Sequence, residues 1–301
     1  MPALRFDREL EFDYGTLETL TPLVRRVVAR NPSPFTLYGT ATFVVGHGRV
    51  AVIDPGPDIA AHVEALTHAL RGETVTHILV THTHLDHSPA AAALKRATGA
   101  KTYGYGPHGG ALGPSGEEGA DRDFAPDVRL ADGDALEGPG WRLETVHTPG
   151  HTSNHLCYAL PEERTLFSGD HVMGWSTSVI SPPDGDMGAY LASLEKLLAR
   201  DDARYVPTHG PAIENPKTYV QALIAHRHER AATILAVLAR GPATIPEIVA
   251  AVYVGLDPRL LRAAGRSTLA HLIHEIGQGR VACEGAPSLD AIFRLARRRS
   301  A

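Results

Sequence analysis

One short segment constrains this chain more than any other, because potential metal ligands crowd into it. It runs Thr81-His82-Thr83-His84-Leu85-Asp86-His87, so three imidazoles and one carboxylate fall within six residues. The apolar run before it, residues 77–80, predicts a buried strand. Ser88, Pro89 and the alanines from Ala90 predict a helix start, with Ser88 as the N-cap and Pro89 in the first position. A strand that ends in His-x-His-x-Asp-His and turns into a helix predicts the metal-binding loop of a hydrolytic enzyme.

Three later segments repeat this arrangement of an apolar strand, a potential ligand and a neighbouring glycine. Glycine permits the tight turns and close backbone approach that a crowded metal loop needs. Because every candidate follows a strand, we expect the side chains to converge on one edge of a sheet sandwich. The later candidates are His151 after the strand at 142–146, Asp170 after 165–168, and His209 after 205–207.

Together these motifs resemble those of the metallo-β-lactamase superfamily, over residues 38–210. The resemblance implies an α+β fold, a four-layer αβ/βα sandwich with a dinuclear metal site. It also implies that Asp54, in Val52-Ile53-Asp54-Pro55-Gly56, supports the ligand loop without binding metal. The implied ligands are His82, His84 and His151 for the first metal, Asp86, His87 and His209 for the second, and Asp170 for both.

This ligand set predicts the chemistry of the site. Imidazoles with a few carboxylates suit zinc, so we expect two Zn²⁺ ions, and Fe or Mn fits the same ligand types. Two close metals can share a water, lower its pKa and make a bridging hydroxide that attacks a carbonyl or phosphoryl centre. Asp86 is the expected catalytic carboxylate, orienting this water and accepting its proton. The predicted reaction is metal-assisted hydrolysis.

Departures within the superfamily narrow the substrate. The second metal group contains no cysteine, unlike the lactamases that use an Asp-Cys-His set, and a bridging Asp170 is typical of thioesterase-like and nuclease-like branches. His84 stands where the flavodiiron branch has Glu. Antibiotic hydrolysis is therefore a minor hypothesis.

Several side chains next to the ligands have open roles. Trp175 either walls the substrate pocket or packs its own loop onto the domain. Asn154 and His171 either hydrogen-bond to ligands or contact the substrate, and for His155 we favour the first role. His108 is expected to be solvated rather than to bind metal.

The remaining pattern of the first domain is ordinary for an α+β protein. Residues 37–45 and 49–53 predict a hairpin around Gly46-His47-Gly48, and residues 59–70 predict an amphipathic helix. Residues 104–127, rich in Gly, Pro and acids, predict a long surface loop beside the site.

A second module follows His209. We predict a catalytic domain over residues 1–213 and, over 214–301, a linker helix with a winged-helix domain. Thr244 is the expected cap of its second helix. The expected elements are helices at 218–238, 244–253, 258–264 and 266–277, then a hairpin that begins near residue 279.

Charge divides along the same boundary. Residues 211–301 hold 12 Lys and Arg against 7 Asp and Glu, so their net charge is +5, and the whole-chain value of −5 leaves −10 for residues 1–210. A basic small domain can indicate nucleic-acid contact, although winged helices also serve in dimerisation, so a homodimer stays open.

No apolar run reaches membrane-spanning length. Cys157 and Cys283 lie far apart, which favours a cytoplasmic protein without disulfides.

The combination of the two domains is similar to the β-lactamase-like protein 2 group, which includes endoribonucleases that act on single-stranded RNA. Three hypotheses follow. The first is a dinuclear hydrolase of a phosphodiester or an ester or thioester, taking a small molecule or single-stranded RNA. The second is a glyoxalase-II-like acyl-glutathione thioesterase. The third is a nucleic-acid-binding protein with a vestigial hydrolase domain, against which the intact ligand set argues.

Overall fold

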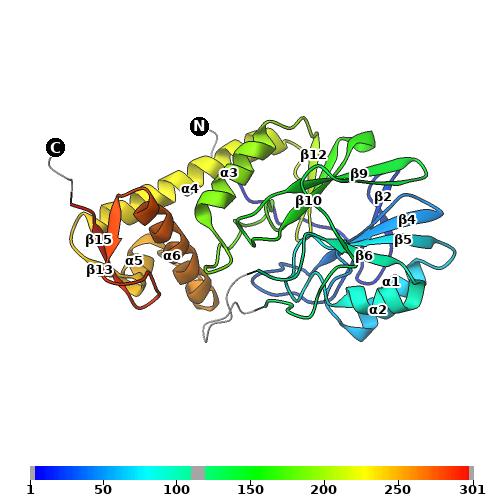
Figure 1. Cartoon of the computed structure of the whole chain (residues 1–301), viewed down its shortest axis with the longest axis horizontal. Coiled ribbons are helices and arrows are strands. Elements are labelled where there is room, and N and C mark those ends of the chain that lie inside the picture. The colour runs from blue at the N-terminus through cyan, green and yellow to red at the C-terminus, as the bar shows by residue number, and fades with distance from the viewer. Residues whose placement is uncertain (1–3, 110–118, 298–301) are drawn as a thin grey trace.

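The computed structural model describes residues 4–109 and 119–297. In this part of the chain two β-sheets stack face to face, helices cover both outer faces, and a smaller domain follows (Figure 1). Residues 110–118 of the predicted long loop lie outside the described residues.

The first sheet has seven described strands in chain order, antiparallel from β1 to β4 and parallel from β4 to β7. Helices α1 (Ala60–Ala69) and α2 (Ala90–Thr98) cover its outer face, where Leu66 and Leu94 are buried. The strands are β1 (Glu18–Thr19), β2 (Val24–Val28), β3 (Ala41–Val45), β4 (Arg49–Ile53), β5 (Thr74–Leu79), β6 (Lys101–Gly104) and β7 (Val128–Arg129).

The second sheet has five described strands in the order β12-β11-β10-β9-β8. Helix α3 (Met187–Leu198) connects β11 to its parallel neighbour β12, and α3 and α4 (Pro216–Leu238) cover the outer face. A 3-10 turn, η1 (Pro161–Glu163), joins β10 to β11. The strands are β8 (Ala135–Gly138), β9 (Trp141–His147), β10 (Leu156–Leu160), β11 (Thr165–Gly169) and β12 (Arg204–Pro207).

Apolar side chains from both sheets form the central core. Phe43 of β3 meets Phe167 of β11 with their ring centroids 5.2 Å apart, and Leu79 and Tyr158 are fully buried in the same cluster. Separate apolar clusters lie between each sheet and its helices. Three cores between four layers confirm the predicted αβ/βα sandwich.

The C-terminal domain has its own core around Ile248 and Phe293 and confirms the predicted winged helix. Thr244 and Glu247 form a capping box at the start of its second helix, as the sequence predicts for Thr244. Its elements are β13 (Ala243–Thr244), α5 (Ile245–Val252), the 3-10 turn η2 (Pro258–Leu260), α6 (Leu261–Gly277), β14 (Val281–Cys283) and β15 (Ile292–Leu295).

Helix α4 belongs to both cores. Its first half buries Val220 and Leu223 against the second sheet, and its second half buries Ile234 and Leu238 in the winged-helix core. At 23 residues the helix is about 34 Å long, and Figure 1 shows it running from the sandwich into the smaller domain. The division at residues 213 and 214 stays a prediction, since one helix stabilises both sides.

Three predicted elements are wrong in detail. The strand expected from Leu37 begins at Ala41, because Leu37 takes a positive φ of 55° and Gly39 a φ of 142°. The two helices expected at 258–264 and 266–277 are one helix after a 3-10 turn, and its Gly265 packs closely beneath Ile245 of α5. Ser88 does not cap α2, because its hydroxyl donates to Asp121 instead.

Within residues 4–109 and 119–297, no helix combines the length and the apolar character that crossing a bilayer requires.

Candidate metal centre

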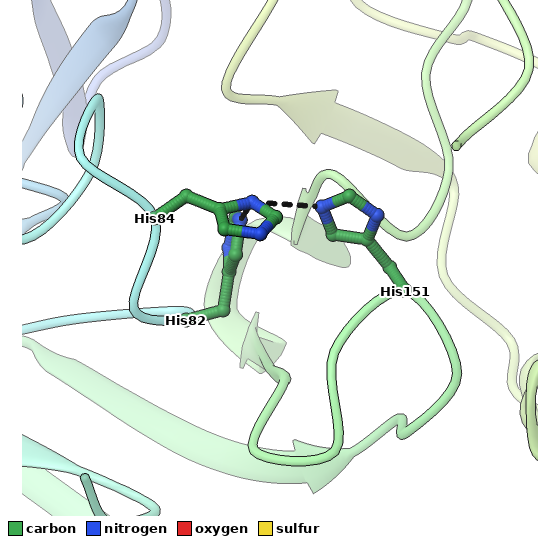
Figure 2. A group of neighbouring side chains, drawn as sticks. All are labelled: His82, His84 and His151. Carbon is green, nitrogen blue, oxygen red and sulfur yellow. Dashed lines mark hydrogen bonds between the residues drawn. The ribbon is translucent and has the colours of Figure 1, made fainter. Parts of the chain in front are cut away.

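Three imidazoles converge from two loops at one edge of the sandwich. His82 and His84 lie on the loop after β5, and His151 lies on the loop after β9 (Figure 2). His82 Nε2 is 2.9 Å from His84 Nδ1, which is 3.2 Å from His151 Nε2. Zn–N bonds of about 2.0–2.1 Å in a tetrahedron place ligand atoms roughly 3.3 Å apart. The three nitrogens are therefore spaced as ligands of one ion.

A second group lies beside the first. His209 Nε2 is 3.2 Å from Asp86 Oδ2, and His87 Nε2 is 3.6 Å from Asp86 Oδ1. Asp170 stands between the groups: its Oδ1 is 3.4 Å from His209 Nε2 and 3.6 Å from His87 Nε2, while its Oδ2 is 3.8 Å from His151 Nε2. One carboxylate thus presents one oxygen to each group. This is the arrangement expected of a bridging ligand.

Two glycines allow this crowding. Gly169 has a φ of +52°, and a Cβ there would lie 2.5 Å from His155 Nε2. Gly150 has a φ of +139°, and a Cβ there would lie 2.3 Å from the Cα of Tyr190. Each glycine immediately precedes a predicted ligand, so a side chain at either position would displace that ligand.

Asp54 holds the second group in place from beneath. Its Oδ1 accepts a hydrogen bond from the Thr81 amide at 2.7 Å, and its Oδ2 accepts from the Thr81 and Thr208 hydroxyls. Oδ2 also lies 2.8 Å from His87 Nδ1, and both side chains are fully buried. Because a carboxylate accepts, His87 carries its proton on Nδ1 and directs Nε2 at the cluster. The predicted supporting role of Asp54 agrees with this geometry.

Backbone carbonyls orient two further imidazoles in the same way. His151 Nδ1 is 2.6 Å from the Val179 carbonyl, and His209 Nδ1 is 3.0 Å from the Gly39 carbonyl. A carbonyl only accepts hydrogen bonds, so both rings donate from Nδ1 and direct Nε2 at the cluster. An unprotonated nitrogen is the form that binds a metal.

The electrostatics keep the carboxylates ionised. Burial alone would raise the pKa of Asp86, but the neighbouring His87 and His209 hold it well below its usual range. The pKa of Asp170 is lowered likewise, where burial opposes and His209 and His87 prevail. Burial and the surrounding imidazoles lower the pKa of His82, which favours its neutral form. The same carboxylates raise the pKa of His87 and of His209 against the effect of burial, so a metal bound there would have to displace a proton from each Nε2.

Unpartnered atoms show that a cation fits here. Among the described residues no hydrogen bond is made by the buried His87 Nε2, His209 Nε2 or Asp170 Oδ1. Buried polar atoms without partners are costly, and they are uncommon in native proteins. All three point into one cluster of nitrogen and oxygen donors, which two divalent ions would satisfy. The donor set suits divalent metals and does not select one of them.

The cluster opens into a cavity of about 650 Å³. His84, Asp86, His151 and Asp170 line its floor. A cavity of this size is typical of small-molecule sites. Its rim carries the apolar side chains of Phe35, Leu85, Pro57, Met173 and Val179, and the arginines Arg259, Arg262 and Arg266.

The side chains with open roles lie outside this cavity. Asn154 is buried and donates to the Thr83 hydroxyl and to the carbonyls of Gly106 and Pro107, so it braces two loops. Buried Trp175 packs against Gly210 and lines a neighbouring pocket.

His155 and His171, two further histidines near Asp170, have different surroundings. His155 Nε2 accepts from the Asp170 amide at 3.2 Å, which supports the favoured role. His171 is fully buried against Tyr190, and burial lowers its pKa to about 3. His108 Nδ1 lies 2.9 Å from the Thr83 hydroxyl, away from the cluster of donors.

Sequence reasoning missed two kinds of residue. Thr81 and Thr208 each precede a predicted ligand histidine, and their hydroxyls both donate to Asp54. Their shared position before a histidine was the signal in the sequence that could have predicted this role. The three rim arginines were counted only as charge. Arg262 and Arg266 are four residues apart, which places them on one helix face, but the sequence does not say what that face meets.

Fold and site together define a metal-dependent hydrolase of the lactamase type, and comparison with known proteins shows the family. The family model described as "Metallo-beta-lactamase superfamily" matches residues 35–209, and "Beta-lactamase associated winged helix domain" matches residues 244–288. The chain therefore belongs to the metallo-beta-lactamase superfamily and is a hydrolase. Proteins with this fold bind divalent metals, and the histidine and aspartate cluster is the matching feature here.

Individual relatives match almost the whole chain. It is 30% identical over 293 residues to the lactamase-like protein adaB of Aspergillus niger, covering 90% of this chain and 86% of that protein. It is 31% identical over 291 residues to an atrochrysone carboxyl ACP thioesterase of Pseudocercospora fijiensis, covering 93% and 82%. A solved beta-lactamase domain protein of Burkholderia ambifaria superposes with a TM-score of 0.80 at 21% identity, covering 97% of each chain, and shows the same fold.

Proposed function

We propose that this protein is a dinuclear metal-dependent thioesterase. One observation carries the proposal: the donor cluster forms the floor of a cavity whose wall carries five apolar side chains beside the three arginines. Phe35 and Leu85 there are 47% and 52% exposed, although side chains of this kind are usually buried. Apolar side chains beside hydrolytic metals suit a substrate whose acyl chain extends from the reacting carbonyl. The relative from Pseudocercospora fijiensis, which is named as an ACP thioesterase, supports the same reaction.

The residues of the site would have three separate roles: to hold the metals, to orient a water and to fix the imidazoles. His82, His84 and His151 would hold one metal, Asp86, His87 and His209 the other, and Asp170 both. Bound there, a metal pair supplies a water of lowered pKa and polarises the substrate carbonyl. The Asp86 carboxylate, part of the cavity floor, accepts a hydrogen bond from that water and orients it. Asp54 and the carbonyls of Gly39 and Val179 hold the imidazoles rigid, which limits reorganisation during the reaction.

Other substrates of the predicted class fit less well. Non-specific binding of single-stranded RNA uses a series of aromatic stacking platforms along a basic groove. Phe35 is the one Phe, Tyr or Trp side chain on the described cavity wall. The observations on the described residues do not favour RNA or a homodimer. Two metals, zinc or else iron or manganese, remain our expectation for the cofactor.

The test is a substrate panel with the metal-loaded full chain. It contains hexanoyl-pantetheine, S-lactoylglutathione, a single-stranded RNA, bis(p-nitrophenyl) phosphate and a chromogenic cephalosporin. We expect thioester turnover, and we expect Asp170→Asn to lower kcat/KM by about a thousandfold, because bridging-metal stabilisation amounts to several kcal/mol. Asp201→Asn, whose side chain is 96% exposed, is the matched control and should retain full activity.

Each other outcome has a clear meaning. Turnover of S-lactoylglutathione alone would favour the acyl-glutathione hypothesis. Cleavage of RNA or of the phosphodiester, without thioester turnover, would overturn the proposal. Elemental analysis should find about two metal ions per chain. A chain without metal that gains no activity on addition of Zn, Fe or Mn would contradict the catalytic hypothesis itself.

A further inference from the structure

Three arginines of the C-terminal domain line the cavity that contains the donor cluster. Arg259 lies in η2, and Arg262 and Arg266 lie on α6. The two helical residues are separated by one turn, about 6 Å along the helix axis, so they share a face. We call these three residues the arginine row. It places cationic groups at the mouth of a site whose floor is made of imidazoles and carboxylates.

Arg266 is the notable member of the row. It is half-buried, and none of the described residues forms an ion pair or hydrogen bond with its guanidinium. Arg25 and Arg26, which are also shielded from solvent, pair with Glu73 and Glu18, and buried Arg227 donates to a backbone carbonyl. Exposed Arg259 forms an ion pair with Asp257 at 2.7 Å. A partly desolvated guanidinium that faces a cavity is a ready partner for an anion.

The row is held in a defined position relative to the metal ligands. The Ile180 amide donates to the hydroxyl of Ser267, the neighbour of Arg266, at 3.4 Å. The Ser178 carbonyl, in the same loop, accepts from buried Arg227 of α4 at 2.6 Å. Between them stands Val179, whose carbonyl orients His151. One loop therefore connects the arginine row to a metal-binding imidazole.

The cavity also has room for a substrate with two ends. A second pocket of about 320 Å³ adjoins it, and Phe35, Met173 and Arg259 border both. A thioester has an acyl group on one side of the reacting carbonyl and a thiol arm on the other. The shared border allows these two parts to extend in different directions from the metals.

We propose that the arginine row, with Arg266 as its principal member, binds an anionic group of the thioester substrate. This inference rests on the proposed function and narrows its substrate class. The anion is either the phosphate of a phosphopantetheine arm or a carboxylate on the acyl group. Arginine recognises both through two parallel N–H donors, which a lysine cannot reproduce.

Three synthetic thioesters distinguish the two sources. Hexanoyl-pantetheine is neutral, hexanoyl-4′-phosphopantetheine carries the phosphate, and adipoyl-pantetheine carries a carboxylate on an acyl chain of equal length. We expect the metal-loaded wild type to prefer one charged substrate over the neutral one. Arg266→Gln should reduce kcat/KM for that substrate by about tenfold to a hundredfold, mainly through KM, and leave the neutral substrate unchanged.

The controls separate charge at this position from charge in general. Arg240→Gln removes an exposed arginine after the end of α4 and should leave all three rates unchanged. Arg266→Lys keeps the charge without the planar fork and should lie between wild type and Arg266→Gln. Equal rates of the wild type on all three substrates, or an equal loss on all three in Arg266→Gln, would overturn the proposal.

A binding measurement keeps this result distinct from that of the proposed function. Calorimetry on the metal-loaded full chain compares 4′-phosphopantetheine and adipate with neutral pantetheine. An anion preference that disappears in Arg266→Gln supports the subsite even if no thioester is hydrolysed, an outcome that would contradict the function alone. Absence of any preference overturns the subsite even if thioesters are hydrolysed.

Discussion

The donor cluster and the arginine row line the same cavity, yet the molecule holds them in opposite ways. His87 and His209 are fully buried, and each is fixed by a short hydrogen bond beneath its ring. Arg266 is half-buried and has no described polar partner, so the fold of α6 alone positions it. The reaction thus depends on a rigid framework inside the sandwich, while substrate choice depends on side chains supplied from the second domain.

The two regions belong to different hydrophobic cores. The ligands extend from the ends of strands whose register is set by the sandwich core, and the arginines extend from a helix packed into the winged-helix core. Changes in the second core should therefore alter the choice of substrate before they alter the chemistry. Substitutions in the two regions should therefore have different effects, and the largest is expected in the donor cluster.

The largest effect is expected on substitution of Asp54, which should lower the metal affinity of the donor cluster. Asp54→Asn keeps the size of the side chain and tolerates the positive φ of 49° at this position, but the amide replaces one acceptor oxygen with a donor. His87 would lose the partner that fixes its proton on Nδ1. We expect metal affinity to fall by about 10- to 100-fold, measured by competition with a chromophoric chelator. The Asp201→Asn control should bind metal as wild type does, and an unchanged affinity in Asp54→Asn would refute the supporting role.

The next effect is expected on the free energy of unfolding, through the contact between Arg227 of α4 and the loop that carries Ser178. Buried Arg227 donates to the Ser178 carbonyl, and its guanidinium lies 5.0 Å from the centroid of the Tyr190 ring. Arg227→Met removes this charged donor and leaves a buried carbonyl without a partner. We expect the free energy of unfolding to fall by about 2 kcal/mol, measured by urea denaturation. Arg240→Met, at an exposed position, should change it by less than about 0.5 kcal/mol, and equal effects of the two substitutions would argue against the contact.

The effect that is smallest at neutral pH, and that grows only in acid, concerns the stability of the second domain. His271 of α6 is buried, and burial together with the charges of Arg227 and Arg230 lowers its pKa to about 3. It stays neutral in the folded chain, whereas the unfolded chain takes up a proton near the ordinary pKa of 6.5. Stability from this group is therefore complete above pH 6.5 and is lost as the pH falls from 6.5 toward 3.

His271→Leu removes that loss. Its free energy of unfolding should decline less steeply than that of the wild type between pH 6 and pH 4, by about 1.4 kcal/mol per pH unit. Urea denaturation of the metal-free chain at several pH values measures the slope. His228→Leu is the control, because His228 is exposed and its surroundings change little on unfolding. Parallel slopes for His271→Leu and wild type would contradict the prediction.

Much of the fold was predictable, because strands and helices in this chain carry clear local signals. The hairpin around Gly46 and Gly48 forms as expected, with both glycines at positive φ. Where prediction failed, a tertiary contact overrode the local pattern. Gly265 does not end a helix, because α6 packs on Ile245 there, and Ser88 bonds to Asp121 from a distant loop rather than to the helix beside it.

The sequence by itself determined which residue types could bind metal and that they follow the ends of strands, because ligand spacing and strand periodicity are local properties. It also indicated a second domain, through the pattern of helices and a hairpin after His209, and a supporting role for Asp54, through the superfamily resemblance. The tertiary structure alone decided that Asp170 directs one oxygen to each group, that Trp175 lies in a neighbouring pocket, and that Arg266 faces the cavity with the metal ligands. These facts depend on how the sheets and helices of the two domains pack together, and such packing brings together residues that are too far apart in the chain for a local sequence pattern to predict.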